Sequence, residues 1–432
     1  MSRGDFAAIE RRSQGDLGPL TTPGLVEQFF RHDYGRLVAT LTPRVGVQHL
    51  ELVEDAVQSA LLAALAAWAR DGAPNDPSAW LYRVASNRLI QDLRRDAGRM
   101  RILEQSADEL SGTFDLAADV EGEERDDMLR MLFVCCDEAV PRESQLVLAL
   151  KTLCGFSTSE IALRLFTSEA NVHKRLGRAR ERLRQRLPDV ETPPLAMLHA
   201  RLPGVRAVLY LLFNEGYLSA HAEHAIRREL CEDAVRLTTL LAEHPVGAVP
   251  ETFALLALMH FHAARLGSRV DASGGLLLLE EQDRSQWNRD RIALGANWLA
   301  RSADGDVFSR FHAEAAIAAE HCFAPSFGET RWKEIADLYA MLERIAPSPL
   351  HSLNRAVAVA EWQGAEAGLA VLDGLAPPAW LVGSYLWDAV LADLHRRAGH
   401  ADTARQHRER AVESAPSDAV RDLLRRRLTT GM

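Results

Sequence analysis

The sequence has few cysteines and few aromatic residues. Both shortages limit the classes of protein to which it can belong. Its five cysteines are Cys135, Cys136, Cys154, Cys231 and Cys322. Because no two of them form a C-x-x-C pair, neither a zinc ribbon nor a disulfide framework is indicated. Such thiols are typical of small buried side chains in a reducing cytosol. Aromatic residues make up only 6% of the chain, and its alanine- and leucine-rich texture favours helices.

Long apolar runs and an excess of basic residues are also missing. No apolar run approaches the ~18 residues that span a bilayer, and the polar N-terminus contains no signal-peptide apolar region. The formal net charge of −10 argues against a chain that simply coats nucleic acid. A composition of 47% hydrophobic and 25% charged residues is ordinary for a soluble globular protein. We therefore expect a cytoplasmic protein without membrane contact.

Motifs for catalysis and for metal binding are absent as well. The sequence contains no phosphate-binding loop, nucleophile elbow or dinucleotide glycine motif. Two histidine pairs, His221 with His224 and His260 with His262, lack cysteine or carboxylate ligands at a firm spacing, which favours ordinary histidines. We expect no catalytic residues, no metal site and no cofactor.

Helical periodicity, in contrast, extends over most of the chain and predicts an all-α fold. Residues 25–100 carry three such patterns. The third pattern, AWLYRVASNRLIQDLRR, follows the turn-forming cluster DGAPNDP at 71–77. Ser78 is placed to cap the helix that we expect to start at Ala79.

An acidic segment separates this first block from a second one. Residues 102–127 hold ten acidic residues against one arginine, which predicts a flexible linker. Helical patterns resume at Met128, stop before Pro188, and then fill the chain from Leu195 onward. The predicted domains are therefore 20–100, 128–188 and 195–432, with the linker at 101–127.

The stretch EIALRLFTSEANVHKRLGRARERLR at 160–184 combines a short apolar helix, a tight break and an arginine-rich helix. Ser168 is a good N-cap for the second helix. Apolar positions such as Ile161 and Val172 can pack the two helices across each other, which is a helix-turn-helix arrangement. The start of the second helix would face base edges, and the arginines from Arg178 to Arg186 would contact phosphates. A solvated basic face is the alternative, but it would not need the packed helix or the cap.

A second basic helix lies in AWLYRVASNRLIQDLRRDAGR, where arginine and amide side chains recur every three or four residues. Most of them can therefore share one face. Such a face beside a loop suits single-stranded or melting DNA, whose unstacked bases need a pocket and whose phosphates need cations. The alternative is that the residues at its start, Trp80 and Leu81, belong to the core.

Together the two basic helices and the acidic tether resemble the promoter-reading domains of a bacterial RNA polymerase sigma factor, specifically of the extracytoplasmic-function (ECF) class. The motifs are WLYRVASNRLIQDLRR, EIALRLFTSEANVHKRLGRARERLRQRL and LELVEDAVQSALLAALAAW, the last being similar to the family's polymerase-binding helix. The resemblance covers about residues 25–187. It implies a sigma factor that binds core RNA polymerase, at its largest-subunit clamp and flap region, and directs promoter recognition and transcription initiation.

The resemblance implies roles for three groups of residues. The −10 element would be engaged by Arg83, Asn87, Arg88, Gln91, Arg94 and Arg95, with the 71–77 loop taking a flipped base. The −35 element would be read by Ser168, Asn171, Lys174, Arg175 and Arg178. Polymerase would be bound by Asp55, Gln58, Leu61, Leu62 and Trp68. Because LFTSEANVHKRL replaces the family's usual glycine-containing turn, the −35 sequence itself is not predictable.

The C-terminal half also resembles a known extension, that of one ECF subgroup with tetratricopeptide-like (TPR-like) repeats. The motifs are VLYLLFNEGYLSA, LLLLEEQDRSQWNRDRI and SPLHSLNRAVAVAEWQG. Gly399, Ala404 and Ala411 match the small-residue spacing of such a repeat, although Arg408 occupies its usual aromatic position. We expect repeats at about 330–430, with two ordinary helical hairpins as the alternative. The resemblance implies an extension that modulates activity and a YCII-related protein as a candidate partner.

The densest polar stretch of this half is EEQDRSQWNRD at 280–290. Its carboxylates could serve acid/base or metal chemistry. However, Glu281 and Arg284 stand three apart, as in a helical ion pair. We expect instead an interdomain contact, made by Gln282, Asp283, Arg284 and Trp287.

Two rival functions remain open at this stage. A helix-turn-helix regulator that acts without polymerase would explain 160–184 but would leave 51–100 without a role. A helical-repeat scaffold with vestigial DNA binding would make both basic helices dispensable. A sigma factor that is not an enzyme accounts for all of these features.

Overall fold

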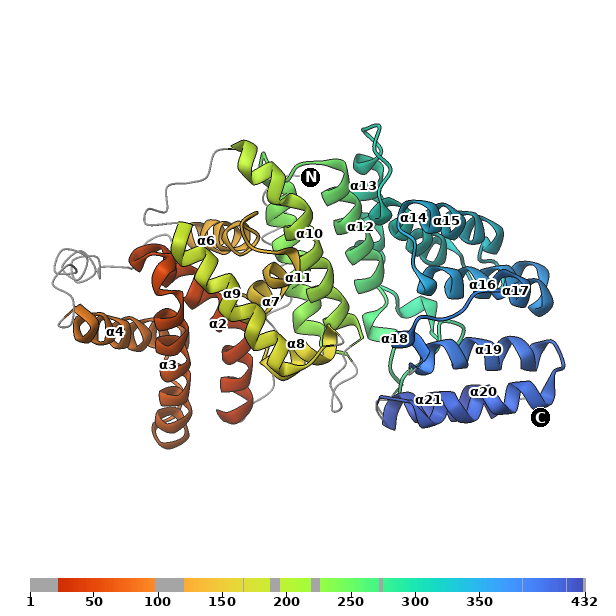
Figure 1. The fold of residues 1–432 in the computed structure, drawn as a ribbon, viewed down its shortest axis with the longest axis horizontal. Coiled ribbons are helices and arrows are strands. Elements are labelled where there is room, and N and C mark those ends of the chain that lie inside the picture. The colour runs from red at the N-terminus through yellow and green to blue at the C-terminus, as the bar shows by residue number, and fades with distance from the viewer. Residues whose placement is uncertain are drawn as a thin grey trace. The chain divides into compact units, whose positions relative to one another are not determined.

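The structure is a computed structural model that describes residues 22–97, 120–165, 167–186, 195–218, 226–271, 275–382, 384–416 and 418–429. Within these ranges the regular elements are helices, and strand-like pairing is limited to one antiparallel bridge between Val270 and Leu276. The all-α prediction is thus confirmed (Figure 1). The chain forms two compact units, an N-terminal unit (1–158 with 172–193) and a C-terminal unit (159–171 with 194–432).

The N-terminal unit begins with three long helices. These are α2 (Thr22–Val45), α3 (Leu50–Asp71, preceded by the short 3-10 turn η1, Val47–His49) and α4 (Pro77–Ala97). Helix α3 ends where Gly72 adopts a positive φ of 80°, a conformation that favours glycine. The cap of α4 is Asp76 rather than Ser78, because Asp76 Oδ1 accepts the N–H of Ala79 at 2.9 Å. The Ser78 hydroxyl instead donates to Asp33 at 3.3 Å.

Helix α3 qualifies the expectation that no stretch is apolar enough to cross a membrane. Residues Val47–Asp71 reach that threshold by length and composition, with a mean hydropathy of 1.3. Nine residues of α3, however, are buried within the protein. Its apolar stripe therefore contributes to the core of the N-terminal unit, against α2 and α4.

Four further helices follow the acidic segment: α6 (Val120–Cys135), α7 (Arg142–Thr152), α8 (Thr158–Arg164) and α9 (Glu169–Arg186). The prediction of a flexible linker over the whole of 101–127 is wrong at its end, because α6 already begins at Val120. Acidic residues are favourable near a helix N-terminus, and Asp127 pairs with Arg130 at 2.9 Å. The remainder, 101–119, lies outside the described residues. Ser168 caps α9 as expected, accepting the N–H of Asn171 at 3.3 Å.

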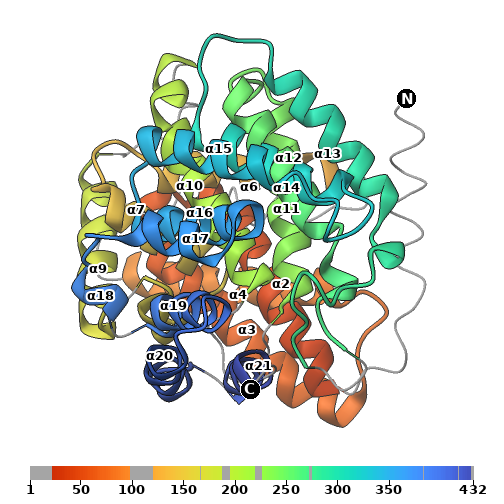
Figure 2. The same ribbon diagram turned by 90° about the vertical axis from the view of Figure 1, so that its right-hand side faces the viewer.

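The C-terminal unit is a succession of helices, with a long connection at 264–288 between α12 and α13. They are α10 (Leu195–Tyr217), α11 (Arg228–Glu243), α12 (Pro250–Ala263), α13 (Arg289–Ser302), α14 (Arg310–Phe323), α15 (Trp332–Ile345), α16 (Pro349–Gln363), α17 (Ala365–Leu372), α18 (Ala379–Val382), α19 (Tyr385–Arg397), α20 (Ala401–Glu413) and α21 (Asp418–Thr429), with 3-10 turns η2 (Leu266–Ser268) and η3 (Arg284–Gln286). Helices α16 and α17, and likewise α19 and α20, lie side by side (Figure 2). Gly364 and Gly399 separate the helices of these pairs with positive φ angles of 95° and 83°, as glycine does at helix ends.

All five cysteines are buried free thiols, as their scattered positions predicted. Burial raises the pKa of the Cys135 thiol well above its ordinary value, and the neighbouring Cys136 adds to this effect. Thiols of this kind are weak nucleophiles, because the thiolate is the reactive form.

Candidate nucleic-acid and polymerase interfaces

Helix α4 separates its apolar and polar residues on opposite faces. The buried face consists of Leu81, Ala85, Leu89 and Leu93. The exposed face carries all six residues predicted to engage the −10 element, namely Arg83, Asn87, Arg88, Gln91, Arg94 and Arg95. Because the apolar face is anchored at 3–4-residue intervals, the polar face is presented along the full length of the helix.

Asp92 divides this exposed face into two parts, a division that residue spacing alone does not predict. Its carboxylate pairs with Arg88 at 2.8 Å and with Arg95 at 3.4 Å. Arg83 and Arg94 form no ion pair within the described part of the chain. The stripe of Arg83, Asn87, Gln91 and Arg94 is therefore the more available half of the surface.

Two aromatic residues support the start of α4. Trp80 packs edge-on against the buried Trp68 of α3, with ring centroids 5.6 Å apart. The Arg44 guanidinium lies over the Tyr82 ring, 5.4 Å from its centroid, and also donates to the Tyr82 hydroxyl. Trp80 thus has a packing partner at the edge of the 71–77 loop. Of Trp80 and Leu81, the two residues considered for the core, only Leu81 is fully buried.

Only part of the predicted polymerase-binding set on α3 reaches the surface. Leu62 is 64% exposed and Asp55 is also exposed, whereas Gln58 is half-buried. Leu61 and Trp68 are 0% and 2% exposed, so neither can contact a partner directly. Leu65, which is not among the predicted residues, is 39% exposed. Its position three residues after Leu62 on α3 could have identified it.

The residues predicted to read the −35 element have different surroundings. Ser168 is used as the cap of α9, and the Asn171 amide donates to the Thr167 hydroxyl at 2.7 Å. Lys174 and Arg178 are exposed. Arg175 is only 19% exposed and pairs with Glu143 at 2.7 Å. Lys174 and Arg178 are therefore the basic side chains of this set that are most exposed to solvent.

Arg180 departs from the expected run of phosphate-contacting arginines. Its guanidinium pairs with Glu54 of α3, whose side chain is 3% exposed, and lies 3.2 Å from Glu51. Glu54 also accepts a hydrogen bond of 2.8 Å from the Thr152 hydroxyl. Arg180 thus joins two helices of the N-terminal unit instead of facing solvent.

The polar stretch at 280–290 lies wholly in the C-terminal unit. Arg284 donates to the carbonyl oxygens of His321 and Ala324, at the end of α14, at 2.7 and 2.6 Å. Arg284 and Arg265 both lie over the Trp287 ring, 4.8 and 5.2 Å from its centroid. These contacts tie the residues after α12 to the end of α14.

The other predicted residues of this stretch support the same junction. Gln282 accepts from Arg265 at 3.3 Å, and Asp283 caps η3 by accepting the N–H of Ser285 at 2.9 Å. The expected helical pair of Glu281 with Arg284 does not form, because the segment is not an α-helix at that point. Glu281 pairs instead with Arg426 of α21 at 3.2 Å.

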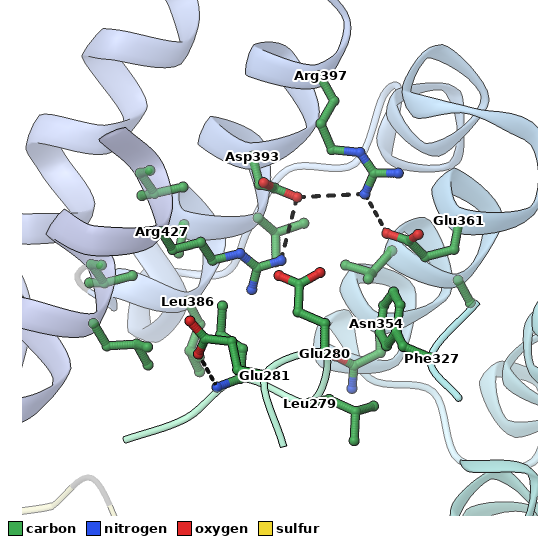
Figure 3. A pocket seen from close by; sticks show the side chains of 18 of the residues that line it. Leu279, Glu280, Glu281, Phe327, Asn354, Glu361, Leu386, Asp393, Arg397 and Arg427 are labelled. Atoms are coloured by element: carbon green, nitrogen blue, oxygen red, sulfur yellow. Dashed lines mark hydrogen bonds and ion pairs between the residues drawn. The ribbon is translucent and has the colours of Figure 1, made fainter. Parts of the chain in front are cut away.

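A cavity of about 800 Å³ lies between residues 278–281 and helices α15, α16, α19 and α21 (Figure 3). Its charged wall centres on the buried Asp393, which lies 2.8 Å from Arg396, 3.5 Å from Arg427 and 3.7 Å from Arg397. Arg397 also pairs with Glu361 at 2.5 Å. Most charges on this wall are therefore compensated internally. No group of three or more potential metal ligands occurs among the described residues.

One buried charge cluster connects the helix-turn-helix to the C-terminal half. Arg227, 2% exposed, lies 3.2 Å from Glu160 of α8 and 3.6 Å from Glu215 of α10. These three residues belong to the C-terminal unit. The sequence did not predict this cluster, because Arg227 begins the string RRELCED and resembles a surface arginine there.

Comparison with known proteins agrees with this arrangement of helices. The family model for Sigma-70 region 2 matches residues 30–99, and that for Sigma-70, region 4 matches residues 130–183. A family of unknown function, DUF6596, matches residues 201–303. The chain is also 36% identical, over 88% of its length and 90% of the relative's, to "Uncharacterized protein R00370" of Rhizobium meliloti (strain 1021). No solved structure gives a significant match.

With a region 2 that contains α4 and a region 4 that contains the helix-turn-helix, the chain belongs to the sigma-70 family of transcription initiation factors. Within that family it is an ECF-type RNA polymerase sigma factor with a C-terminal helical extension. Its domains are those of a non-enzymatic regulator that binds core polymerase and promoter DNA.

Proposed function

We propose that this sigma factor contacts the −10 element through the exposed stripe of α4 and the −35 element through Lys174 and Arg178 of α9. The observation that carries this proposal is the two-faced character of α4, whose six polar residues are exposed while four apolar residues are buried. Asn87 and Gln91 supply donors and acceptors for unstacked bases, and Arg83 and Arg94 supply cations for phosphates.

Core polymerase is bound by the surface of α3 that Asp55, Leu62 and Leu65 form. Two exposed leucines on one helix face are typical of a partner-binding surface, since burying them on association is favourable. In this proposal the partner is the clamp of the largest subunit, with region 4 at the flap. The protein acts in the cytoplasm, where polymerase and promoter DNA are found.

The C-terminal extension modulates promoter binding through the helix-turn-helix. The support for this role is the buried contact of Arg227 with Glu160, on the helix that precedes the DNA-reading helix. A buried ion pair holds its partners in one geometry, because either charge left alone carries a large desolvation cost. The helical pairs at about 330–430 form TPR-like repeats that support this extension and offer a surface to a partner such as a YCII-related protein. The interdomain contact predicted for Gln282, Asp283, Arg284 and Trp287 is revised in this proposal to a junction within the extension, because Gln282, Arg284 and Trp287 are buried against its own residues.

The test is transcription in vitro with core polymerase, the purified full-length chain and a library of promoter sequences. We expect initiation from a defined subset of promoters that contain both elements. If the chain binds duplex DNA but never binds polymerase, the rival helix-turn-helix regulator is correct. If Lys174→Glu combined with Arg178→Glu leaves activity unchanged, the scaffold function is correct.

A further inference from the structure

The cavity of about 800 Å³ in the C-terminal unit contains none of the residues assigned to DNA or to polymerase. All of its lining residues belong to that one unit, and most of them come from the repeat-like helices α15, α16, α19 and α21 and from the segment 278–281. Small-molecule sites in proteins usually have volumes of about 300–1,000 Å³ and combine an apolar wall with a few polar groups. The volume of this cavity therefore fits a small ligand.

One part of the cavity wall is apolar and aromatic. Its residues include Leu279, Phe327, Trp332, Ile335 and Tyr339. Phe327 packs edge-on against Trp332, with ring centroids 5.1 Å apart, and the His321 ring lies 5.4 Å from Trp332. Burial, together with the charges of two nearby arginines, lowers the pKa of His321 to about 3, so its imidazole adds no charge at neutral pH. This part of the wall suits an apolar or aromatic group.

A second part of the wall carries a guanidinium that its neighbours hold weakly. Arg427 lies 3.5 Å from the Asp393 carboxylate, which Arg396 approaches more closely, at 2.8 Å. Among the described residues Arg427 has no other ion pair, and its side chain is 35% exposed. A guanidinium has five N–H donors, so one long contact leaves most of them for a further acceptor. Arg427 can therefore bind an anionic group in the cavity.

Glu280 supplies a charge of the opposite sign. It is exposed and forms no ion pair with any arginine in the described part of the chain, whereas its neighbour Glu281 pairs with Arg426 at 3.2 Å. The Glu280 side chain points from its segment into the cavity (Figure 3). A carboxylate in this position can bind a cationic group.

We propose that this cavity is a binding site for a zwitterion with a bulky apolar side chain, either a free amino acid or a dipeptide. The ligand ammonium pairs with Glu280, its carboxylate pairs with Arg427, and its side chain packs on Trp332. Four arginines and four carboxylates line the cavity, so a ligand without net charge preserves their balance. A ligand with only one charge would instead cover either Glu280 or Arg427 without a partner, which is unfavourable. The inference goes beyond the proposed function, because such binding needs neither polymerase nor DNA.

The first experiment screens the full-length chain by saturation-transfer-difference NMR. The probes are the proteinogenic amino acids and all of their dipeptide combinations, in small pools. We expect binding to be confined to members with a large apolar side chain, and calorimetry of the strongest binder then separates the two sources, by comparing a dipeptide with its component amino acids. If no probe binds with a Kd of about 1 mM or lower, the proposal is overturned.

The second experiment removes one ligand charge at a time. The strongest binder is compared with its N-acetylated form, which lacks the ammonium, and with its C-amidated form, which lacks the carboxylate. Each blocked form loses a charge-assisted hydrogen bond, so each should bind about tenfold more weakly or worse. Undiminished affinity of either form would show that the ligand is not recognised as a zwitterion.

The third experiment assigns each charge to its residue. Glu280→Gln should weaken binding of the strongest binder about tenfold but leave that of its N-acetylated form unchanged, and Arg427→Gln should do the same with respect to the C-amidated form. The controls are Glu334→Gln on α15 and Arg425→Gln on α21, since both side chains are exposed and neither lines the cavity. Circular dichroism establishes that each variant is folded.

The blocked forms keep the test decisive even where a variant perturbs the fold. A variant that is merely destabilised loses the intact and the blocked ligand alike, and such equal loss in both charge variants would overturn the assignment, as would affinities equal to that of the parent. Ligand binding and transcription initiation are measured separately. A chain that binds the ligand but never initiates contradicts the proposed function alone, and a chain that initiates but binds no probe contradicts the ligand site alone.

Discussion

The Arg227 guanidinium lies 3.2 Å from the Glu160 carboxylate, although 67 residues separate them in the chain. Arg227 precedes α11 in the extension, and Glu160 lies in the first helix of the helix-turn-helix. Arg227 is 2% exposed and Glu160 is 21% exposed, so removal of Glu160 would leave the arginine charge buried without this counter-charge. The geometry of α8 therefore depends on a residue outside region 4.

Substitution Arg227→Ala should destabilise the C-terminal unit strongly. It leaves Glu160 and the buried Glu215 without their shared cation, and breaking a buried pair costs about 3–5 kcal/mol. Urea unfolding followed by circular dichroism measures the change. The exposed neighbour Arg228 offers the control, since Arg228→Ala should stay within about 0.5 kcal/mol of the parent. A double-mutant cycle with Glu160→Gln that shows no coupling would contradict the prediction.

Removal of Lys174 and Arg178 should lower the salt dependence of promoter binding. For each phosphate that the protein no longer neutralises, the slope of log K against log salt decreases in magnitude by about 0.9. The measurement is holoenzyme binding to one promoter fragment at several salt concentrations, comparing Lys174→Ala and Arg178→Ala with the parent. Arg344→Ala, an exposed charge on α15, should leave the slope unchanged. Unchanged slopes for both α9 variants would exclude them from the DNA interface.

Asn87→Ala and Gln91→Ala should impair promoter melting more than duplex binding. Each side chain faces solvent on α4 and would hydrogen-bond an unstacked base, an interaction worth about 0.5–1.5 kcal/mol. Permanganate reactivity of melted thymines measures the amount of open complex. If a variant loses about 1.4 kcal/mol of interaction with the unstacked base, that amount should fall about tenfold. A template with a pre-formed bubble supplies the control. Failure of the bubble to restore initiation would argue against a melting role.

Substitutions of two adjacent leucines of α3 should differ in their effects, one on polymerase binding and the other on stability. Leu62→Asp changes a side chain that is 64% exposed, so stability should shift by less than about 0.5 kcal/mol while polymerase affinity falls about tenfold or more. Leu61→Ala removes a fully buried side chain and should cost about 2–5 kcal/mol of stability. Unfolding curves and polymerase pull-downs separate the two effects. Equal decreases in stability would mean that Leu62 also packs in a core.

Acid should destabilise the C-terminal unit through three histidines. Burial lowers the pKa of His260, His262 and His321 from 6.5 to about 3, and nearby arginines add to the effect. Below pH 6.5 the unfolded chain binds protons that the folded chain does not. The contribution of these neutral histidines to the free energy of unfolding is therefore fully present above pH 6.5. It decreases as the pH falls towards 3, by up to about 1.4 kcal/mol per pH unit for each histidine. Urea midpoints between pH 7.5 and 5 measure this, and His260→Gln should flatten the dependence.

Sequence periodicity was sufficient to predict the helices and the exposed polar face of α4. The apolar positions of α4 recur at helical spacing, so the position of its polar face follows directly. Ser168 could be recognised as a cap because capping depends on a few neighbouring residues. Leu61 and Leu62 were not separated, because the choice between them depends on how α3 is rotated against α2 and α4.

Contacts between distant segments could not be predicted in this way. Glu160 and Arg227 each have many acidic and basic neighbours in sequence, and nothing local selects their pairing. Glu54 did carry a signal, since it lies in the apolar stripe of α3, four residues after Leu50 and three before Val57. A carboxylate in that position implies a buried charge with a distant partner. The identity of that partner, Arg180, depends on tertiary structure alone.

The contact of Arg227 with Glu160 is made within one polypeptide, and this fixes how it can be controlled. An intramolecular contact experiences a constant effective concentration, so dilution or a change in expression level does not release it. A regulator encoded as a separate chain would instead respond to the ratio of the two proteins. Here each copy of the promoter-reading domains is made with its own copy of the extension. A signal that alters this contact must therefore change its chemistry or its geometry, not the amount of a partner.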